Sequence, residues 1–451
     1  MKNRLFRLKI VLLAMMLFIV SASSYVYGED TIEETSSEIK IEIKYPIAPE
    51  IVAKGAILMD ADTGAILYEK DAYSQYYPAS ITKIMTCLLA IENLSLEDEI
   101  TFTEDVFATL PWDAALLGVQ KGETLTVKDC LYGLMIRSGN EVAVALAIAV
   151  SGSEEEFGKL MTARAKEMGA KNTVFTNASG LYQDTHITTP YDMAVITREA
   201  LKNGTFAEVF GTSVYEMPAT NMSEPYTIYH THSMLVEGRE QYYQYAKGGK
   251  TGYEDLAKRT LVTYAEKDGL SLISVVMFDE NDAYFPDTEK LLDFGFTNFK
   301  KVRVIDDENR FGNGSFVSIP DTDYLTIPND VNIEDLQYET IYNEDNSDGN
   351  ISQIMYYYDG HYMGESKLTF VEQEETDKAG VVTPVIKEEK EKENVYIDIG
   401  YILAAIVAII IIILIIVYLI KTKEARKIKR DRKRLFKEAS RKYKIKKKRR
   451  N

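Results

Sequence analysis

Ser80 and Lys83 are the first residues whose types and spacing suit catalysis. They belong to the run Pro78-Ala-Ser-Ile-Thr-Lys83, at the start of a predicted helix that continues through Ala90. Side chains three residues apart lie over the same face of a helix. A lysine that is drawn out of water loses affinity for its proton and can then accept the proton of a serine. The pair is therefore a candidate nucleophile and base, although most pairs with this spacing lie on solvated helix faces.

Two further short motifs carry groups that suit a peptide substrate. In Ser138-Gly-Asn140 a hydroxyl could relay a proton to a departing amine, and an amide could hold a peptide carbonyl. Lys250-Thr-Gly252 offers a cation, a hydroxyl and a residue without a side chain, which suits a carboxylate lying close to the backbone. Each motif alone is also compatible with an ordinary turn or a glycine-rich loop. The second one lacks the Gly-x4-Gly-Lys-Thr spacing of a phosphate-binding loop.

Strand signals at both ends of the central region predict the sheet that would position these motifs. Residues 55–59 and 65–68 read as two strands around a turn. Residues 259–265 and 270–278 alternate between apolar and polar side chains and are predicted to form a hairpin. If these late strands pair with the early ones, the helical insert packs on an antiparallel sheet, which is an α+β fold.

The helical insert contains a predicted break at residues 138–140, where Ser138 and Asn140 lie. Thr126 and Asp129 have the spacing of a capping box before an apolar helix. That helix stops at the break, and residues 141–149 resume a helical composition. Side chains at such a break can project into a cleft.

Composition and charge narrow the class of protein. The chain has 451 residues, 46% of them hydrophobic, which is enough for more than one core. Its formal net charge is −17, although residues 421–451 hold eighteen Lys and Arg against three Asp and Glu. The remainder is therefore very acidic, which argues against nucleic acid as a partner.

The two cysteines, Cys87 and Cys130, are too few for a disulfide scaffold. Both lie on apolar predicted helices, so we expect free thiols in the core, with a bridge between the two helices as the alternative. The four histidines include His230 and His232, but we predict no metal site there.

Both ends of the chain carry membrane signals. Basic residues followed by an apolar run predict a signal peptide over residues 1–28, with a retained anchor as the alternative. The apolar run of residues 399–420 is long enough for the ~30 Å core of a bilayer. The positive-inside rule then keeps the basic residues 421–451 in the cytoplasm and everything before the span outside. The charge of this tail also predicts contact with anionic lipid.

The three motifs occur in the order Ser-x-x-Lys, Ser-x-Asn and Lys-Thr-Gly, which is typical of penicillin-binding proteins and class A β-lactamases. The chain resembles the low-molecular-mass penicillin-binding proteins that are serine D-alanyl-D-alanine carboxypeptidases. Family-like runs also occur at residues 131–140, 177–181 and 287–296, so the resemblance covers about residues 50–300. It implies a transpeptidase domain of the β-lactamase and DD-peptidase type, followed by a small all-β domain.

The predicted organisation has seven segments. They are a signal peptide (1–28), an acidic linker (29–49), a DD-peptidase catalytic domain (50–298), a small β-rich domain (299–371), a charged linker (372–398), a transmembrane helix (399–420) and a basic cytoplasmic tail (421–451).

The resemblance implies roles for the motif residues. Lys83 takes the proton of Ser80, which attacks the carbonyl of the penultimate D-alanine. The backbone N–H groups of Ser80 and Tyr253 hold the oxyanion, and Ser138 with Lys250 passes a proton to the leaving D-alanine. Substrate binding falls to Asn140, Lys250, Thr251 and Gly252. The expected partners are a stem peptide ending in D-Ala-D-Ala and β-lactam antibiotics, without a metal or cofactor.

The sequence departs from the family pattern at Glu141, where Asp is frequent, and at Glu254, Ala257 and Lys258 after the Lys-Thr-Gly motif. These departures affect the subsites more than the reaction. A β-lactamase, an endopeptidase that cleaves D-alanyl cross-links and a catalytically weak penicillin-binding scaffold remain the alternatives.

Overall fold

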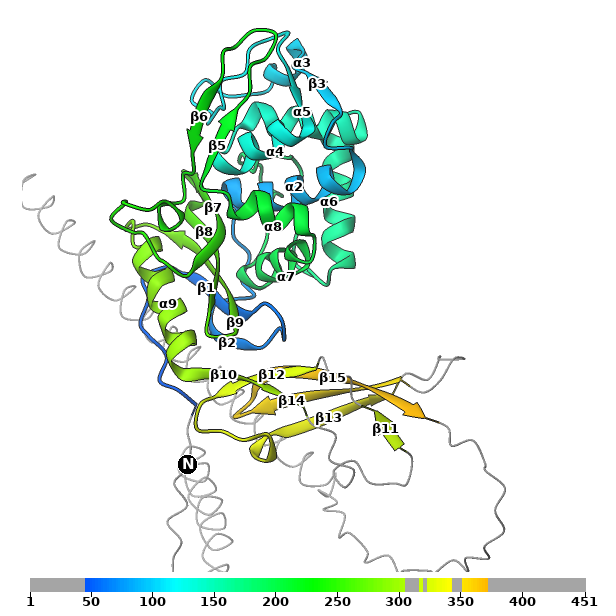
Figure 1. Cartoon of the computed structure of the whole chain (residues 1–451), viewed down its shortest axis with the longest axis vertical. Coiled ribbons are helices and arrows are strands. Elements are labelled where there is room, and N and C mark those ends of the chain that lie inside the picture. Colours follow the sequence, from blue (N-terminus) through cyan, green and yellow to red (C-terminus); the bar gives the residue numbers. More distant parts are fainter. Residues whose placement is uncertain (1–44, 305–315, 319–322, 343–350, 372–451) are drawn as a thin grey trace, which may run out of the picture. The chain divides into compact units, whose positions relative to one another are not determined.

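The protein is built around a five-stranded antiparallel sheet (Figure 1). The structure is a computed structural model that describes residues 45–304, 316–318, 323–342 and 351–371. Strands β1 and β9 pair over six residues, so the predicted pairing of early with late strands is confirmed. Strands β8 and β9 form the predicted hairpin, and its turn residues Asp268 and Gly269 both have positive φ, as a tight hairpin turn requires. In sheet order the strands are β2 (Ile66–Lys70), β1 (Gly55–Asp60), β9 (Leu270–Asp279), β8 (Lys258–Lys267) and β7 (Ala246–Glu254).

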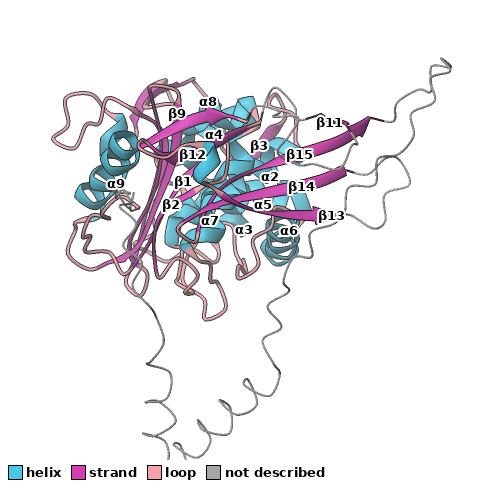
Figure 2. Ribbon diagram, turned by 90° about the horizontal axis from the view of Figure 1, so that it is seen from below, coloured by secondary structure: helices cyan, strands magenta, loops and turns pink. Residues whose placement is uncertain are grey.

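The two faces of the sheet are buried against different helices. In β1, Ile57 and Met59 join one hydrophobic cluster with the helices of the insert, whereas Ala56 and Leu58 join another with α9 (Tyr284–Asn298). Successive strand residues point to opposite faces, so a strand buried on both sides is apolar throughout. Figure 2 shows α9 on one side of these strands and the other helices on the opposite side.

The insert between β2 and β7 is mainly helical. Its longer helices are α2 (Lys83–Asn93), α4 (Val127–Ile136), α5 (Asn140–Ser151), α6 (Glu154–Glu167), α7 (Pro190–Leu201) and α8 (Gly204–Gly211). Short elements complete it: the 3₁₀ turns η1 (Ala79–Thr82) and η2 (Ser233–Leu235), helix α3 (Glu104–Phe107), and the strand pairs β3 (Glu99–Thr101) with β4 (Thr124–Thr126) and β5 (Val214–Met217) with β6 (Tyr226–Tyr229).

The helix expected to start at Ser80 starts at Lys83 instead. Ser80 lies in η1, and Ala79 before it has a φ of 51°, a left-handed conformation that an α-helix does not accommodate. The expected helix break is confirmed, because α4 ends at Ile136 and α5 begins at Asn140. Thr126 caps α4 by accepting from the Asp129 N–H (3.1 Å), while its own hydroxyl donates to the Asp129 carboxylate.

Strands follow directly after α9. A two-stranded sheet pairs β10 (Phe299–Arg303) with β12 (Tyr324–Pro328), and a four-stranded sheet has the order β11 (Phe316–Ser318), β15 (His361–Val371), β14 (Ile351–Tyr358) and β13 (Gln337–Tyr342). A short 3₁₀ turn, η3 (Ile333–Asp335), precedes β13. Leu325, Ile327, Ile354, Tyr356 and Met363 are the centre of a hydrophobic cluster that these strands share.

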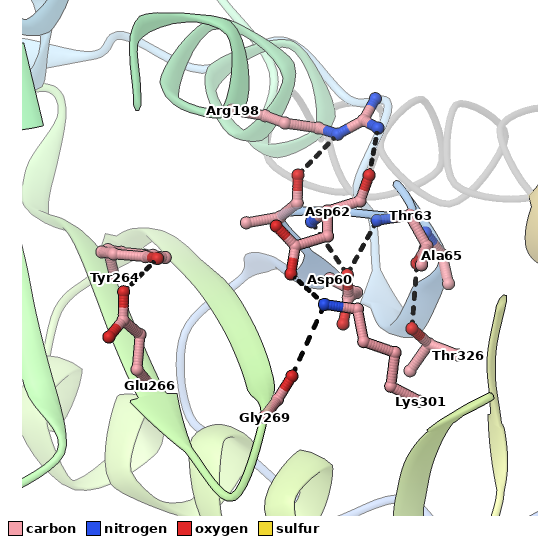
Figure 3. A network of polar contacts seen from close by, with 11 residues as sticks. Asp60, Asp62, Thr63, Ala65, Arg198, Tyr264, Glu266, Gly269, Lys301 and Thr326 are labelled. Carbon is pink, nitrogen blue, oxygen red and sulfur yellow. Dashed lines mark hydrogen bonds and ion pairs between the residues drawn. The ribbon is translucent and has the colours of Figure 1, made fainter. Parts of the chain in front are cut away.

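Polar contacts join these strands to the turn between β1 and β2 (Figure 3). Lys301 on β10 contacts the Asp62 carboxylate, and the hydroxyls of Thr63 and Thr326 lie 2.9 Å apart. The Asp60 carboxylate folds the turn by accepting from the N–H groups of Asp62 (2.9 Å) and Thr63 (2.8 Å).

In the part of the chain that the structure describes, no helix is both long and apolar enough to cross a membrane. The predicted signal peptide (1–28), charged linker (372–398), membrane span (399–420) and basic tail (421–451) lie outside the described residues, as does the acidic linker up to residue 44.

Candidate active site

A cleft of about 480 Å³ lies where η1, the α4–α5 break and the end of β7 meet. Ser80, Ser138 and Asn140 open onto it, and so do Thr251, Gly252 and Tyr253. Residues of the 111–115 segment and of the 180–181 segment form two further sides. The three motifs, which are far apart in the sequence, thus line one cleft.

Lys83 Nζ lies 3.0 Å from Ser80 Oγ. Its side chain is fully buried, and two further oxygens surround Nζ: Asn140 Oδ1 at 2.6 Å and the Ser179 carbonyl at 2.6 Å. Both of these oxygens are acceptors only. A neutral amine has two N–H bonds for them, and its lone pair then faces the serine hydroxyl.

Burial is the main reason why Lys83 can be neutral. It lowers the lysine pKa well below its usual value, the nearby charge of Lys250 lowers it further, and Glu141 partly opposes the shift. The shift matches what a general base needs, because only the unprotonated amine can accept the proton of Ser80.

A second serine–lysine pair stands across the cleft. Lys250 Nζ donates to Ser138 Oγ (2.9 Å) and to the Thr251 carbonyl (2.8 Å), and its side chain is fully buried. Burial lowers the pKa of Lys250 to about 7. Ser138 has a φ of 61°, a strained conformation for a residue with a side chain, which turns the chain sharply between the helices.

Gly252 lets strand β7 approach the nucleophile. A Cβ at this position would lie 2.9 Å from the Ser80 nitrogen and 2.3 Å from Thr260 Oγ1, so no larger residue fits. Thr260 on β8 donates to the Pro78 carbonyl (2.8 Å) and thereby ties the sheet to η1. The close approach brings the backbone around Ser80 and that around Tyr253 to the same end of the cleft.

A loop that the sequence could not assign to the site completes it. The Ser179 carbonyl holds Lys83, and Gly180, with a φ of 86°, packs so tightly that a Cβ there would lie 1.9 Å from the Ala79 oxygen. His186 links this loop to η1. The backbone N–H of Thr176 donates to His186 Nδ1 (3.0 Å). The proton of the ring is therefore on Nε2, which donates to Thr82 Oγ1 (2.9 Å). Burial first, and then the charge of Lys83, lower the pKa of His186 to about 3. The run of residues 177–181 was the available signal, but a backbone carbonyl leaves no trace in residue types.

The cations that line the cleft are not the lysines of the motifs. Arg137 and Arg259 reach its surface, whereas Lys83 and Lys250 lie behind the two serines. Arg259 Nε donates to Asp282 Oδ1 (2.8 Å), and the guanidinium lies over the rings of Tyr253 (4.6 Å) and Tyr284 (5.6 Å).

The residues that depart from the family pattern lie at different places: one of them lines the cleft and the others do not. Glu254 lines the cleft and also a neighbouring cavity of about 260 Å³. Ala257 is buried, and Lys258 has a φ of 59° at the start of β8. Glu141 is fully buried on α5.

The other candidates from the sequence lie away from the cleft surface. His230 and His232 are both fully buried, and the His232 N–H donates to His230 Nδ1 (2.9 Å). Within the described ranges, no group of three or more His, Cys, Asp or Glu is placed to hold a metal. Cys87 and Cys130 are buried free thiols.

Comparison with known proteins gives a consistent picture. A family model described as D-alanyl-D-alanine carboxypeptidase matches residues 42–281. The D-alanyl-D-alanine carboxypeptidase DacF of Bacillus subtilis is 36% identical over 258 residues, which are 55% of this chain and 63% of the relative. DacC of Escherichia coli is 33% identical over 275 residues, 58% of this chain and 66% of the relative. The chain thus spans slightly less than two thirds of these two curated relatives.

A solved structure shows the same fold. The Streptomyces K15 DD-transpeptidase matches with a TM-score of 0.52 and 30% identity, over 56% of this chain and 100% of that chain.

Proposed function

This chain belongs to the D-alanyl-D-alanine carboxypeptidase family, and from that premise we propose that it removes the terminal D-alanine from peptidoglycan stem pentapeptides through an acyl-enzyme on Ser80. One observation carries the proposal. The amine of a fully buried lysine, Lys83, stands 3.0 Å from the hydroxyl of a serine that opens onto a cleft. A nucleophile within hydrogen-bond reach of a base with a lowered pKa is the arrangement that acyl transfer needs.

Acylation starts at this pair. Neutral Lys83 keeps its two N–H bonds on Asn140 Oδ1 and the Ser179 carbonyl, and its lone pair takes the Ser80 proton. Ser80 Oγ then attacks the carbonyl of the penultimate D-alanine. The N–H groups of Ser80 and Tyr253 are the proposed oxyanion donors, and one such donor is worth about 3–4 kcal/mol in comparable hydrolases.

The leaving D-alanine needs a proton, which the second pair supplies. Ser138 Oγ faces the cleft and accepts from Lys250 Nζ (2.9 Å), so the serine can give its proton to the departing amine and be reprotonated by the lysine. A pKa of about 7 makes Lys250 suited to give up and regain a proton near neutral pH. Water then attacks the acyl-enzyme carbonyl and gives a proton through Ser138 to Lys250, while Ser80 Oγ leaves and takes its proton back from Lys83, so that both lysines return to their starting states.

Recognition of the terminal carboxylate was assigned from the sequence to Lys250 and Thr251, with Gly252 leaving room for it. Because Lys250 is enclosed behind Ser138, we add Arg259 to this role. Arg259 lines the cleft together with Thr251, and its hydrogen bond to Asp282 is made by Nε. A guanidinium matches the two oxygens of a carboxylate. Asn140 is left to position the peptide amide.

The β-lactams are proposed ligands of the same site, because their fused ring presents a carbonyl and a carboxylate as D-alanyl-D-alanine does. The direct test has two arms. Purified wild-type protein should release D-alanine from a stem pentapeptide and be labelled by a fluorescent penicillin, and Ser80→Ala should lose both. Labelling without release would leave a penicillin-binding scaffold, and labelling of Ser80→Ala would overturn the assignment of the nucleophile.

The organisation of the rest of the chain is part of the proposal. The strands from β10 to β15 and their shared hydrophobic cluster support a small all-β domain over residues 299–371. A membrane span at 399–420, a cell-membrane location with the catalytic domain outside, and contact of the basic tail with anionic lipid rest on the sequence. Alkaline extraction of membranes tests the span: the full chain should stay with the membrane, whereas a chain ending at residue 398 should be released.

A further inference from the structure

Glu141 is a buried acid next to Asn140, which lines the cleft, and the proposed reaction gives it no role. It is the second residue of α5 and is 0% exposed. Its Oε1 accepts from the N–H groups of Gly118 (2.8 Å) and Val119 (3.4 Å), while Oε2 is buried without a hydrogen-bond partner within the described part of the chain. A buried carboxylate with only one of its two oxygens hydrogen-bonded lowers the stability of the fold, so we expect that it serves a function.

Its hydrogen bonds hold the segment that forms one wall of the cleft. We call residues 111–119 the wall loop; Pro111, Asp113, Ala114 and Ala115 of this loop line the cleft. Glu141 holds one end of the loop at Gly118.

The neighbouring Asn140 N–H holds the middle of the wall loop through the Ala115 carbonyl (2.8 Å). Leu117 is seated where Gly133 lacks a side chain, since a Cβ there would lie 2.4 Å from Leu117 Cδ2. The N-terminus of α5 therefore fixes the wall loop and, through the Asn140 side chain, Lys83 as well.

The other oxygen of Glu141 lies next to Gly139, the middle residue of the Ser138-Gly-Asn140 motif. A Cβ at Gly139 would lie 3.2 Å from Oε2, so the glycine between Ser138 and Asn140 leaves the space that this oxygen occupies. A shorter aspartate at position 141 would not reach both Gly118 and this space, because it has one methylene less.

Ionisable groups face one another across this region from several elements. Lys83 on α2 and Lys250 on β7 are buried amines, and Glu141 is the acid whose charge acts on Lys83. In addition to burial, the charge of Glu141 raises the pKa values of Cys130 on α4 and Tyr226 on β6, and the charge of Lys83 lowers the pKa of His186. Burial raises the pKa of Glu141, while the backbone N–H groups that it accepts from oppose that rise.

We propose that Glu141 is a positioning residue with two tasks, which rest on the proposed function: it fastens the wall loop to α5, and it places a negative charge beside Asn140, which holds Lys83. The first task depends on Oε1 as an acceptor, and the second on the ionised carboxylate. The two can therefore be separated by substitution.

Glu141→Gln keeps an acceptor for the Gly118 N–H and removes the charge. Acylation rises with pH as Lys83 loses its proton, so a lower lysine pKa moves this ascending limb to lower pH. We expect a shift of about one pH unit, which is a common size for the effect of one nearby charge. The measurement is the rate of labelling by a fluorescent penicillin from pH 5 to 10.

Glu141→Ala removes both the charge and the acceptor. Trp112 is the one tryptophan of the chain; it lies in the wall loop and is 96% exposed, so its fluorescence anisotropy reports on the loop alone. We expect lower anisotropy for Glu141→Ala and an unchanged value for Glu141→Gln. Glu141→Asp keeps the charge but shortens the side chain. We expect its ascending limb to stay near that of the wild type and its anisotropy to be lower. This variant tests the proposal if Glu141→Gln is too unstable to assay.

A matched control is available in Glu123. This buried carboxylate also accepts from a backbone N–H, that of Gln120 (2.8 Å), but it is not among the charges that act on Lys83. Glu123→Gln should leave the ascending limb in place. If the profiles of the wild type and Glu141→Gln superimpose, the charge task is wrong, and if Glu141→Ala keeps the anisotropy, the fastening task is wrong. A wild-type protein that penicillin does not label would instead refute the proposed function itself.

Discussion

The two serine–lysine pairs of the cleft use the same residue types at nearly the same distance, 3.0 Å and 2.9 Å, but the chain assembles them differently. Ser80 and Lys83 are three residues apart, on η1 and at the start of α2. Ser138 and Lys250 are separated by 112 residues and meet only because β7 packs beside the α4–α5 break.

The surroundings of the two amines also differ. Lys83 has two acceptor oxygens besides Ser80, and the charges of Lys250 and Glu141 act on it. Lys250 has one carbonyl besides Ser138, and burial alone lowers its pKa to about 7. Partners beyond the pair, and not the distance between its members, thus distinguish Lys83, the proposed base of acylation, from Lys250, the proposed source of the proton for the leaving amine.

Substitution of each lysine by methionine tests this division and should give the largest effect. Lys83→Met removes the base, and we expect acylation by penicillin to slow toward the upper end of the about 10²–10⁴-fold range for general catalysis. Lys250→Met should fall toward the lower end of the same range, since the strained ring needs less help to leave. Rapid-mixing fluorescence measures both rates.

Folding must be preserved for that comparison to have meaning. Circular dichroism and the melting temperature should show a folded protein for both methionine variants, which keep most of the side-chain volume. Equal losses of rate would break the distinction between the two pairs and make them one catalytic unit.

How far the sequence could anticipate this site depends on the kind of contact. The pair of Ser80 and Lys83 was predictable because helical geometry fixes neighbours three residues apart. Lys250-Thr-Gly252 was compatible with a glycine-rich loop as judged from the sequence, and it lies in β7. Alternation in residues 259–265 and 270–278 was enough to predict the hairpin of β8 and β9.

The parts that the sequence did not reveal depend on packing. The Ser179 carbonyl reaches Lys83 only because Gly180 fits against Ala79, and no residue type signals a backbone acceptor. The start of α2 was misplaced by three residues because residues 79–82 form a 3₁₀ turn, which their residue types do not distinguish from the first turn of an α-helix. Arg259 was overlooked because its side chain reaches the cleft from β8, nine residues beyond Lys250.

Arg259 sharpens the comparison, because the proposed function assigns the substrate carboxylate to Arg259 as well as to Lys250. Arg259→Ala should raise KM for the pentapeptide about 10–100-fold, which corresponds to the loss of about 1.5–3 kcal/mol for a hydrogen bond to a charged group. Arg137 also lines the cleft but lies at the α4 end, so Arg137→Ala is the matched control and should change KM less than threefold. Steady-state release of D-alanine measures both variants. An unchanged KM in Arg259→Ala would return the carboxylate to Lys250.

The smallest expected effect is on the free energy of unfolding. It tests the protonation state of Lys250 without any measurement of catalysis. The pKa of Lys250 is about 7 in the folded protein and near its ordinary value of 10.5 in the unfolded chain. Between these values the unfolded state binds a proton that the folded state does not, so the free energy of unfolding rises with pH in this window. The stabilisation is complete above 10.5 and is lost as the pH falls toward 7.

Lys250→Met removes this titration, so the difference in unfolding free energy between wild type and variant should change by about 1.2 kcal/mol from pH 7.5 to 8.5, in favour of the wild type at the higher pH. Urea unfolding of both proteins at the two pH values measures it, and the tyrosines and other titrating groups cancel because both proteins share them. Lys83→Met should show a slope of the same sign, since burial lowers that pKa as well. A pH-independent difference for Lys250→Met would mean that Lys250 stays protonated in the folded protein, and the two lysines would then differ in charge and not only in their partners.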